Sequence, residues 1–181
     1  MKVIRTDIPE VMVLEPKVFG DHRGFFFESY NELAFHDATG LRPRFVQDNH
    51  SRSTRGVLRG LHYQIRQAQG KLLRCTAGEI FDVAVDIRRS SSTFGRWVGA
   101  RLSGENKRQL WVPAGFAHGF LVLSDSADLL YKTTDYYAPE FDRGIVWNDP
   151  DLKIQWPLDG EPLLSDKDRH GRFFRDADLY E

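Results

Sequence analysis

Cysteine and long apolar segments are scarce in this sequence, and each absence excludes a class of protein. The single cysteine, Cys75, rules out an internal disulfide and a multi-cysteine metal site, and such usage fits a reducing compartment. No stretch approaches the ~20 apolar residues that a membrane-spanning helix needs. The first residues, MKVIRTDIPEV, lack the apolar segment of a signal peptide. We therefore expect a soluble, cytoplasmic protein with no membrane partner.

An excess of one charge is also missing. The 181 residues carry 25 Lys and Arg against 26 Asp and Glu, a formal net charge of -1. A molecule so close to neutral has no long-range field that attracts nucleic acid, so none is expected as a partner. Hydrophobic residues make up 41% and charged residues 28%, the usage of an ordinary globular protein. With no repeat, linker or low-complexity segment, residues 1–181 are expected to form a single domain.

Hydrophobic alternation of period two is the strongest pattern present. Residues 79–88 place Phe81, Val83, Val85 and Ile87 at alternate positions, which predicts a strand with one buried face. Shorter runs of this kind predict strands at 24–28, 44–49, 61–65, 71–76, 96–102, 109–112, 120–123 and 129–137. Short strands at fairly even spacing favour an antiparallel sandwich or barrel over a βαβ fold.

Helical signals are confined to one short segment near the N-terminus. Ser29 followed by Glu32 has the spacing of a capping box, and Gly40 is placed to end a helix, so a helix is predicted over Tyr30–Thr39. After Ala138 the sequence is rich in Pro, Asp and Gly and alternates little. We expect this C-terminal part to wrap over the β core.

Polar residues share a face on three of the predicted strands. If the strands form a closed barrel, faces that point into its core should be apolar. Each such face, taken alone, could be solvated. Together they predict a polar cavity, because amide, imidazole and phenol groups on adjacent strands suit a small polar ligand. The three faces consist of Phe45, Gln47 and Asn49; Gly60, His62 and Gln64; and Tyr131, Thr133, Asp135 and Tyr137.

Two histidine segments, GLHYQ at 60–64 and PAGFAHGF at 113–120, resemble the paired β-barrel motifs of the cupin superfamily. A metal-binding cupin has a second histidine two positions after the first, where this chain has Gln64, and an amide is a poor replacement for a metal-bound imidazole. The pattern favours a site without metal, in which His62 is free to act as a base. A metal-dependent cupin oxygenase remains an alternative.

A closer resemblance is carried by eight segments, which follow one another over almost the whole chain. They are FGDHRGFFFESY (19–30), FVQDNHSRS (45–53), GVLRGLHYQ (56–64), QGKLLRCTAGEIFDVAVDIR (69–88), PAGFAHGF (113–120), YKTTDYYAPE (131–140), IVWNDPDLKIQWP (145–157) and LLSDKD (163–168). In this order they resemble the dTDP-4-dehydrorhamnose 3,5-epimerase family. The resemblance implies an all-β, cupin-type jelly-roll barrel, to which the residues add a short N-terminal helix and a wrapped C-terminal tail.

The resemblance also implies a reaction and an absence of cofactors. The family inverts C3 and C5 of dTDP-4-dehydro-6-deoxy-D-glucose to give dTDP-4-dehydro-L-rhamnose, with neither metal nor redox cofactor. Both carbons flank the C4 ketone, so catalysis needs a base, stabilisation of the enolate oxygen, and an acid on the opposite face of the sugar. The product would serve the synthesis of L-rhamnose for cell-surface polysaccharide.

Four residues match the catalytic positions of that family. His62 matches the base, and Asp168 matches the carboxylate that orients it and raises its basicity. Tyr131 matches the proton donor, since a phenol is protonated at neutral pH. Lys71 is expected to meet the enolate oxygen with a compact positive charge.

Ten further residues match substrate-binding positions. Planar or charged donors suit the diphosphate, polar groups suit the remaining contacts, and aromatic rings suit the base or sugar, with Tyr137 expected to stack on thymine. In that order they are Arg23, Arg59 and Lys167; Glu28, Gln47, Asn49 and His118, with Asp142 where the family frequently has Glu; and Phe19 and Tyr137. Arg59 and His62 are an odd number of residues apart and would face opposite sides of a regular strand.

The resemblance further implies a homodimer with strands exchanged or paired across the interface, for which exposed strand edges give a physical reason. Two alternatives keep the same fold. One is an epimerase that acts on C5 or C3 only, and the other is a noncatalytic sugar-nucleotide-binding cupin. The motifs do not separate one inversion from two.

Overall fold

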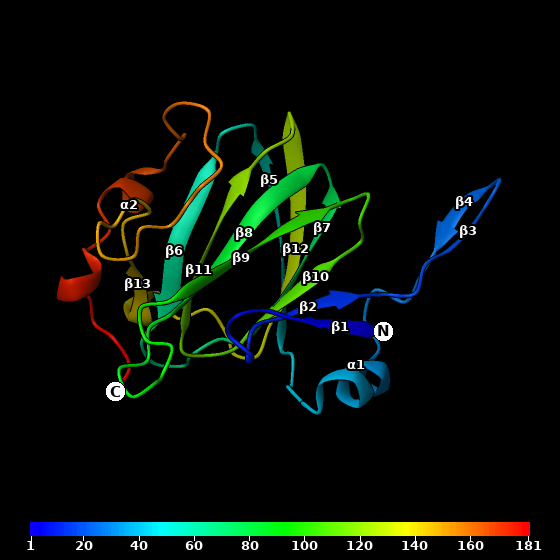
Figure 1. The fold of residues 1–181 in the computed structure, drawn as a ribbon, viewed down its shortest axis with the longest axis horizontal. Helices are drawn as coiled ribbons and strands as arrows, with labels where there is room; N and C mark the ends of the chain where they lie inside the picture. Colours follow the sequence, from blue (N-terminus) through cyan, green and yellow to red (C-terminus); the bar gives the residue numbers. More distant parts are fainter.

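Two antiparallel sheets face each other in the computed structural model, which describes residues 1–181 (Figure 1). The six-stranded sheet has the order β1 (Lys2–Arg5), β2 (Met12–Glu15), β10 (Gln109–Val112), β7 (Lys71–Ala77), β12 (Ser126–Thr133), β5 (Gln47–Thr54). The five-stranded sheet has the order β13 (Asp142–Gly144), β6 (Leu58–Gln64), β11 (Phe116–Val122), β8 (Glu79–Asp86), β9 (Trp97–Ser103). This arrangement confirms the prediction of an all-β jelly-roll fold.

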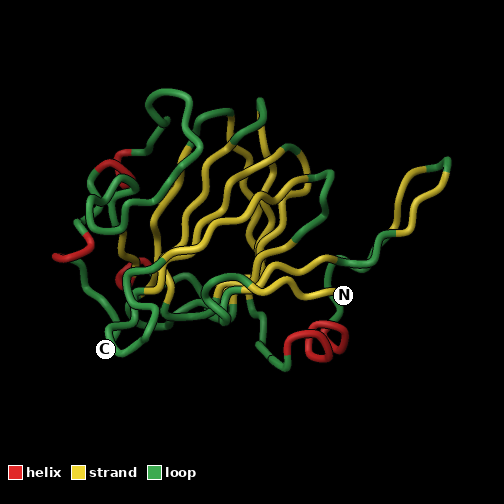
Figure 2. Tube along the Cα trace, in the orientation of Figure 1, coloured by secondary structure: helices red, strands yellow, loops and turns green.

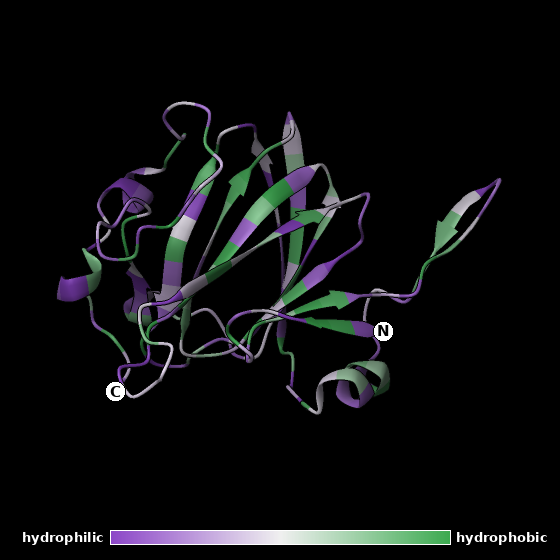
Figure 3. Cartoon of the chain, in the orientation of Figure 1, coloured by the Kyte–Doolittle hydropathy of each residue, from purple (hydrophilic) through white to green (hydrophobic).

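Apolar residues fill three layers rather than one. Between the sheets lie side chains such as Leu73 of β7 and Ile80 of β8. The outer face of the five-stranded sheet is covered by the C-terminal part of the chain, and the outer face of the six-stranded sheet is covered by α1 (Glu32–Thr39) through Phe35. Figure 3 shows apolar residues recurring along the strands of both sheets.

The predicted strands all overlap observed ones, but their buried faces are not all where alternation suggested. In β8, Val83 and Val85 face the C-terminal segment, while Ile80 and Ala84 of the opposite face lie in the core between the sheets. Both faces of β8 are therefore buried. The strand β2 escapes prediction for the same reason, because three consecutive apolar residues are buried on its two faces and no alternation is left.

The N-terminal helix begins later than predicted. Asn31, not Ser29, is the N-cap, and its side chain accepts a hydrogen bond of 3.0 Å from the Ala34 N–H. The Ser29 carbonyl instead accepts a hydrogen bond from the side chain of Gln109. Gly40 ends the helix in the left-handed conformation, as predicted.

Beyond Ala138 the chain runs as loops and short elements against the five-stranded sheet (Figure 2). The helical turns in this segment are η1 (Pro139–Phe141), α2 (Asp166–Arg169) and η2 (Phe174–Asp176). Ile145, Leu152 and Ala177 are buried against the sheet, so the predicted wrapped tail is confirmed. Neither α-helix has the length and apolar character needed to cross a membrane.

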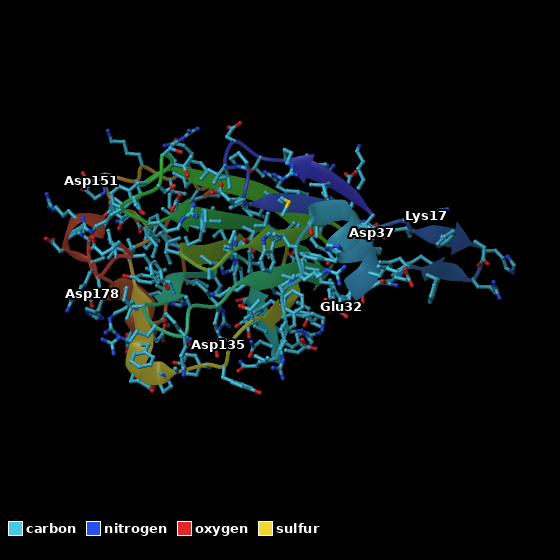
Figure 4. The ribbon with its side chains drawn as sticks, turned by 90° about the horizontal axis from the view of Figure 1, so that it is seen from below. Lys17, Glu32, Asp37, Asp135, Asp151 and Asp178 are labelled. Carbon is cyan, nitrogen blue, oxygen red and sulfur yellow. The ribbon has the colours of Figure 1, made fainter.

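A separate hairpin, β3 (Phe19–Asp21) and β4 (Gly24–Phe26), stands clear of both sheets (Figure 1). Figure 4 shows the same separation from a perpendicular direction, with Lys17 near the point where the hairpin leaves the body. Phe25 and Phe26 are 61% and 69% exposed. A hairpin this short gains little stability alone, and Phe25 contacts the body of its own chain through Lys107, whose Nζ lies 4.0 Å from the centre of the ring.

Candidate active site

A bulge in β6 brings Arg59 and His62 to one face of the strand. His62 pairs with His118 of β11 and Arg59 pairs with Phe120, so three steps along β6 match two steps along β11. The extra residue reverses the alternation between Arg59 and His62. Gly60 occupies the bulge at φ 118°, and a Cβ there would lie 2.6 Å from the Gly119 Cα. Arg59 and His62 can therefore both face the substrate site, which they could not do on a regular strand.

The inner face of the five-stranded sheet carries one half of the site. His62 and His118 are direct cross-strand neighbours, which places their Cβ atoms ~5 Å apart. Asp142 of β13 pairs with Gln64 of the same sheet. The Gln64 side chain bonds only backbone groups, donating to the Gln67 and Tyr136 carbonyls and accepting from the Ala138 N–H.

The inner face of the six-stranded sheet carries the other half. Tyr131 of β12 lies between Leu73 of β7 and Asn49 of β5, and Thr133 lies between Lys71 and Gln47. Because Leu73 is in the core between the sheets, its cross-strand neighbours on the same face also point inward. Lys71 and Tyr131 therefore face the sheet that carries the two histidines. The two inner faces thus direct polar side chains from both sheets into one interior, as the sequence predicted.

His62 is coupled to a buried carboxylate from the C-terminal segment. Its Nε2 lies 2.7 Å from Asp168 Oδ1, in contact but outside the alignment of a hydrogen bond. Burial would raise the pKa of Asp168, but interactions with His62, Ser165 and the Gly60 N–H lower it to about 2. The adjacent ionised carboxylate favours the tautomer with its proton on Nε2, which leaves Nδ1 to accept another proton.

Tyr131 is a phenol in a sparsely hydrated position. Burial raises its pKa above the ordinary value, the nearby Arg59 charge opposes that rise, and Asp142 adds to it. Both charged neighbours belong to the opposite sheet. The Tyr131 hydroxyl is thus protonated at neutral pH and directed toward the sheet that carries His62.

Lys71 is an ammonium without a salt-bridge partner. Burial lowers its pKa to about 8, and the charges of Asp82 and Asp142 limit the fall while Lys167 adds to it. At neutral pH most of the Lys71 population is still protonated. An unpaired cation of this kind is free to meet a developing oxyanion.

Two of the expected binding residues, Arg59 and Lys167, lie in one cavity with the catalytic candidates His62 and Asp168. A cavity of about 440 Å³ has Arg59, His62, Lys167 and Asp168 in its wall. Lys167 is paired with Asp142, which also accepts a 3.1 Å hydrogen bond from the Tyr137 hydroxyl. These contacts place two cations and an exposed aromatic ring at the open end, where a nucleotide diphosphate could bind.

The amides of β5 support the same end of the site. Gln47 Oε1 accepts a 3.0 Å hydrogen bond from the Tyr137 N–H, and Gln47 Nε2 donates to Asn49 Oδ1 at 3.0 Å. Phe45, expected on this face, instead packs in the aromatic cluster under α1 with Tyr30, Phe35 and Trp111. It precedes β5 and does not follow the alternation of that strand.

Three predicted residues lie away from the two inner faces and the cavity beside His62. Phe19, Arg23 and Glu28 belong to the projecting hairpin and its flank. Arg23 is paired with Asp21 in its own turn, and Glu28 accepts a hydrogen bond from Asn31. Within one chain they cannot contribute to the site that holds His62.

Comparisons with known proteins agree with this geometry. A family model described as dTDP-4-dehydrorhamnose 3,5-epimerase matches residues 5–176. The chain is 70% identical over 180 residues to the dTDP-4-dehydrorhamnose 3,5-epimerase of Pseudomonas aeruginosa, with 99% of each chain covered. The chain belongs to this epimerase family.

Solved structures show the same relationship. A dTDP-6-deoxy-D-glucose-3,5-epimerase from Legionella pneumophila Philadelphia 1, in complex with dTDP-4-keto-L-rhamnose, matches with a TM-score of 0.97 and 55% identity, over 99% of this chain and 97% of that one. A 3'-monoepimerase from Streptomyces bikiniensis, in complex with dTDP-quinovose, matches with a TM-score of 0.89 and 38% identity, over 97% of this chain and 88% of that one. The predicted isomerase activity, in dTDP-rhamnose biosynthesis, is confirmed.

Sequence reasoning missed Asp82, which lies inside this epimerase and is fully buried. Its Oδ1 lies 2.7 Å from His118 Nε2. The apolar residues on either side of Asp82 suggested that its side chain faced solvent. The one signal that could have located it is the pair of acidic residues, Asp82 and Asp86, on a strand that is apolar on its other face.

No group of three or more His, Cys, Asp and Glu side chains is placed to hold a metal ion. His62 and His118 are each engaged by a separate carboxylate, and the side-chain oxygen and nitrogen of Gln64 are occupied by backbone groups. The prediction that the reaction needs no metal stays a prediction, to be tested by turnover in the presence of a chelator.

Proposed function

We propose that this epimerase inverts both C3 and C5 of dTDP-4-dehydro-6-deoxy-D-glucose, with His62 as the base and Tyr131 as the acid. The observation that carries the proposal is their placement on facing sheets. His62 projects from β6 and Tyr131 from β12, on either side of one polar interior. A sugar held between them exposes one face to the imidazole and the other to the phenol. Proton removal on one face and return on the other inverts the carbon.

The proton transfers follow from the chemistry of each group. His62 Nδ1 takes the hydrogen from the carbon beside the C4 ketone, and the electron pair moves onto the ketone oxygen. The Lys71 ammonium stabilises that enolate oxygen, a type of contribution worth ~10² to 10³ in rate. The ketone then re-forms as the carbon takes a proton from Tyr131 on the opposite face. For the next turnover the His62 imidazolium loses its proton to solvent and the Tyr131 phenolate gains one from it.

The alternative function is inversion at a single carbon. It is supported by the similarity of the fold to the 3'-monoepimerase of Streptomyces bikiniensis. Identity supports two inversions, because the chain is 55% identical to the Legionella 3,5-epimerase and 38% identical to the monoepimerase. The two reactions need the same base and the same acid. They differ in which carbons come within reach of His62.

Incubation of substrate in deuterated water tests the proposal directly. We expect deuterium at both C3 and C5 of the product, with the configuration inverted at each, as read by proton NMR. Label and inversion at one carbon only would establish the narrower enzyme. A chelator in a parallel reaction should leave the rate unchanged.

We also infer that the chain acts as a homodimer in which each hairpin completes the site of the other copy. The hairpin carries Phe19 and Arg23, presents the exposed rings of Phe25 and Phe26, and leaves the body of its own chain. When a partner covers exposed apolar rings of this kind, they are removed from water, and this burial stabilises the association. An arginine expected to bind diphosphate can then reach a site only in the second copy.

A further inference from the structure

A second pair of carboxylate and imidazole lies inside the sandwich beside the first. Asp82 on β8 is fully buried and holds His118 through a 2.7 Å contact between Oδ1 and Nε2. His118 is the cross-strand neighbour of His62, so the two pairs share one interior. The proton transfers proposed above make no use of Asp82.

The second oxygen of Asp82 is unusual. Oδ2 is buried and has no hydrogen-bond partner in the chain. A buried acceptor without a partner costs ~1–3 kcal/mol, and more when it is charged, so such a group is retained only where something offsets it. Asp82 shares the inner face of its sheet with Phe120, and Lys71 projects from the inner face of the opposite sheet into the same interior, where it has no salt bridge.

The charges facing Lys71 come from three elements. Asp82 of β8 and Asp142 of β13 are negative, and Lys167 of α2 is positive. Asp142 is already neutralised in part by its ion pair with Lys167. The other charged or titratable groups of this interior are His62, which is paired with Asp168, His118, which is paired with Asp82, the cationic Arg59 and the neutral Tyr131. Asp82 is therefore the one carboxylate near Lys71 that no cationic side chain of Lys or Arg balances.

We propose that Asp82 is a positioning residue of the epimerase, which holds the His118 ring with one oxygen and keeps Lys71 in its ammonium form with the charge of the other. This inference rests on the proposed role of Lys71 at the enolate oxygen. A buried lysine without an opposing charge tends to lose its proton and could not stabilise an oxyanion.

The arrangement keeps Lys71 charged without occupying it. A direct ion pair would engage the ammonium and compete with the substrate oxygen. Because Oδ1 is held by His118, the carboxylate acts on Lys71 through space, and the hydrogen-bonding groups of the ammonium stay available. Coulomb attraction falls slowly with distance in a sparsely hydrated interior, so the effect does not need contact.

Titration of Lys71 by NMR tests the inference. The chain is labelled with ¹³C at the lysine Cε, and the Lys71 signal is assigned from its loss in Lys71→Arg. Removing the anion disfavours the ammonium, so in Asp82→Asn the titration midpoint should fall by ~1 pH unit. Since the active form carries the proton, the alkaline limb of kcat/KM should move down in pH by the same amount.

Two further variants make the result decisive. Asp82→Ser removes the charge with a different shape, so the measurement does not depend on one substitution folding. Asp86→Asn removes another fully buried carboxylate of β8, one held by Arg88, Ser91 and Thr93, and should leave the Lys71 midpoint in place. An unchanged midpoint in both neutral variants, or an equal shift in Asp86→Asn, would overturn the inference.

Failure of the proposed function would look different. If Lys71→Gln retained full turnover, Lys71 would not be the partner of the enolate, although its midpoint would still respond to Asp82. If Lys71→Gln were inactive and the midpoint ignored Asp82, only the inference about Asp82 would fail.

Discussion

The chemistry of individual side chains here depends on which neighbours share their interior. His62 gains direction from Asp168, whose low pKa of about 2 keeps it ionised throughout the working range. Tyr131 is kept protonated by burial, and Lys71 loses part of its basicity for the same reason. One desolvated interior thus favours a neutral acid and a weakened cation at once.

At this scale we predict that His62→Ala and Tyr131→Phe fail in different ways. Without the imidazole no proton is removed, so both solvent exchange and epimerisation should fall by ~10² to 10⁴. Without the phenol, His62 can still remove a proton and return it to the same face, so exchange should continue while inversion is lost. Deuterium incorporation and product configuration, measured by NMR on the same samples, report the two processes separately.

Matched substitutions outside the cavity serve as controls for that prediction. His50 forms a 2.9 Å pair with Asp128 on the outer face, and Tyr136 is 62% exposed. His50→Ala and Tyr136→Phe should both keep exchange and inversion. Undiminished turnover in both His62→Ala and Tyr131→Phe would refute the assigned roles.

At the scale of the element, the bulge of β6 determines which side chains of that strand face the interior. It places both Arg59 and His62 on the inner face of the five-stranded sheet, with His62 beside His118. Gly60 permits this because β6 and β11 approach so closely that a Cβ would overlap the backbone of Gly119. A local feature of the backbone therefore sets the spacing between the diphosphate end and the base.

We predict that Gly60→Ala lowers the free energy of unfolding by ~2 kcal/mol or more, because the added methyl group meets backbone at 2.6 Å and φ is 118°. Activity should fall as well, since Arg59 and His62 would be displaced together. Gly160→Ala is the control: φ is 89° but nothing lies within 4 Å of the new Cβ, so the cost should be ~1–2 kcal/mol with activity unchanged. Urea unfolding and kcat/KM give the two readouts, and equal stability losses would contradict the steric explanation.

At the scale of the whole molecule, one chain brings the proposed catalytic residues together but leaves part of the predicted binding set apart from them. Arg59 and Lys167 line the cavity beside His62, whereas Phe19, Arg23 and Glu28 lie on or beside the β3–β4 hairpin. Figure 4 shows this hairpin projecting from the body. The projecting hairpin and the separated binding residues are both explained if each copy in a dimer inserts its hairpin beside the cavity of the other copy.

Complementation between two inactive variants tests this arrangement. Arg23→Ala damages the hairpin, and His62→Ala damages the cavity. In a mixed dimer one cavity keeps its own His62 and receives an intact Arg23 from the partner, so co-expression should restore activity that neither variant has alone. If Arg23 served its own chain, both cavities of the mixed dimer would be damaged and the mixture would stay inactive.

Much of the fold could be predicted because alternation is a local property of the sequence. The runs that became β7, β8, β9 and β10 were recognisable from period-two spacing, and Gly40 was recognisable as the end of α1. Prediction failed where tertiary contacts replaced the local rule. The strand β2 is buried on both faces, and the side chain of Asn31 caps α1, while the Ser29 carbonyl bonds the Gln109 side chain of β10.

The sequence by itself determined which chemical groups are present and how the segments follow one another, which was enough to indicate a cupin-type epimerase with His62, Tyr131, Lys71 and Asp168. Only the tertiary structure decided which face of each strand is inward, since period two distinguishes two faces without saying which is the interior. It paired His62 with Asp168, placed Asp82 behind His118, and turned Phe19 and Arg23 away from the cavity. Those outcomes depend on sheets packing across long sequence separations, which local spacing does not encode.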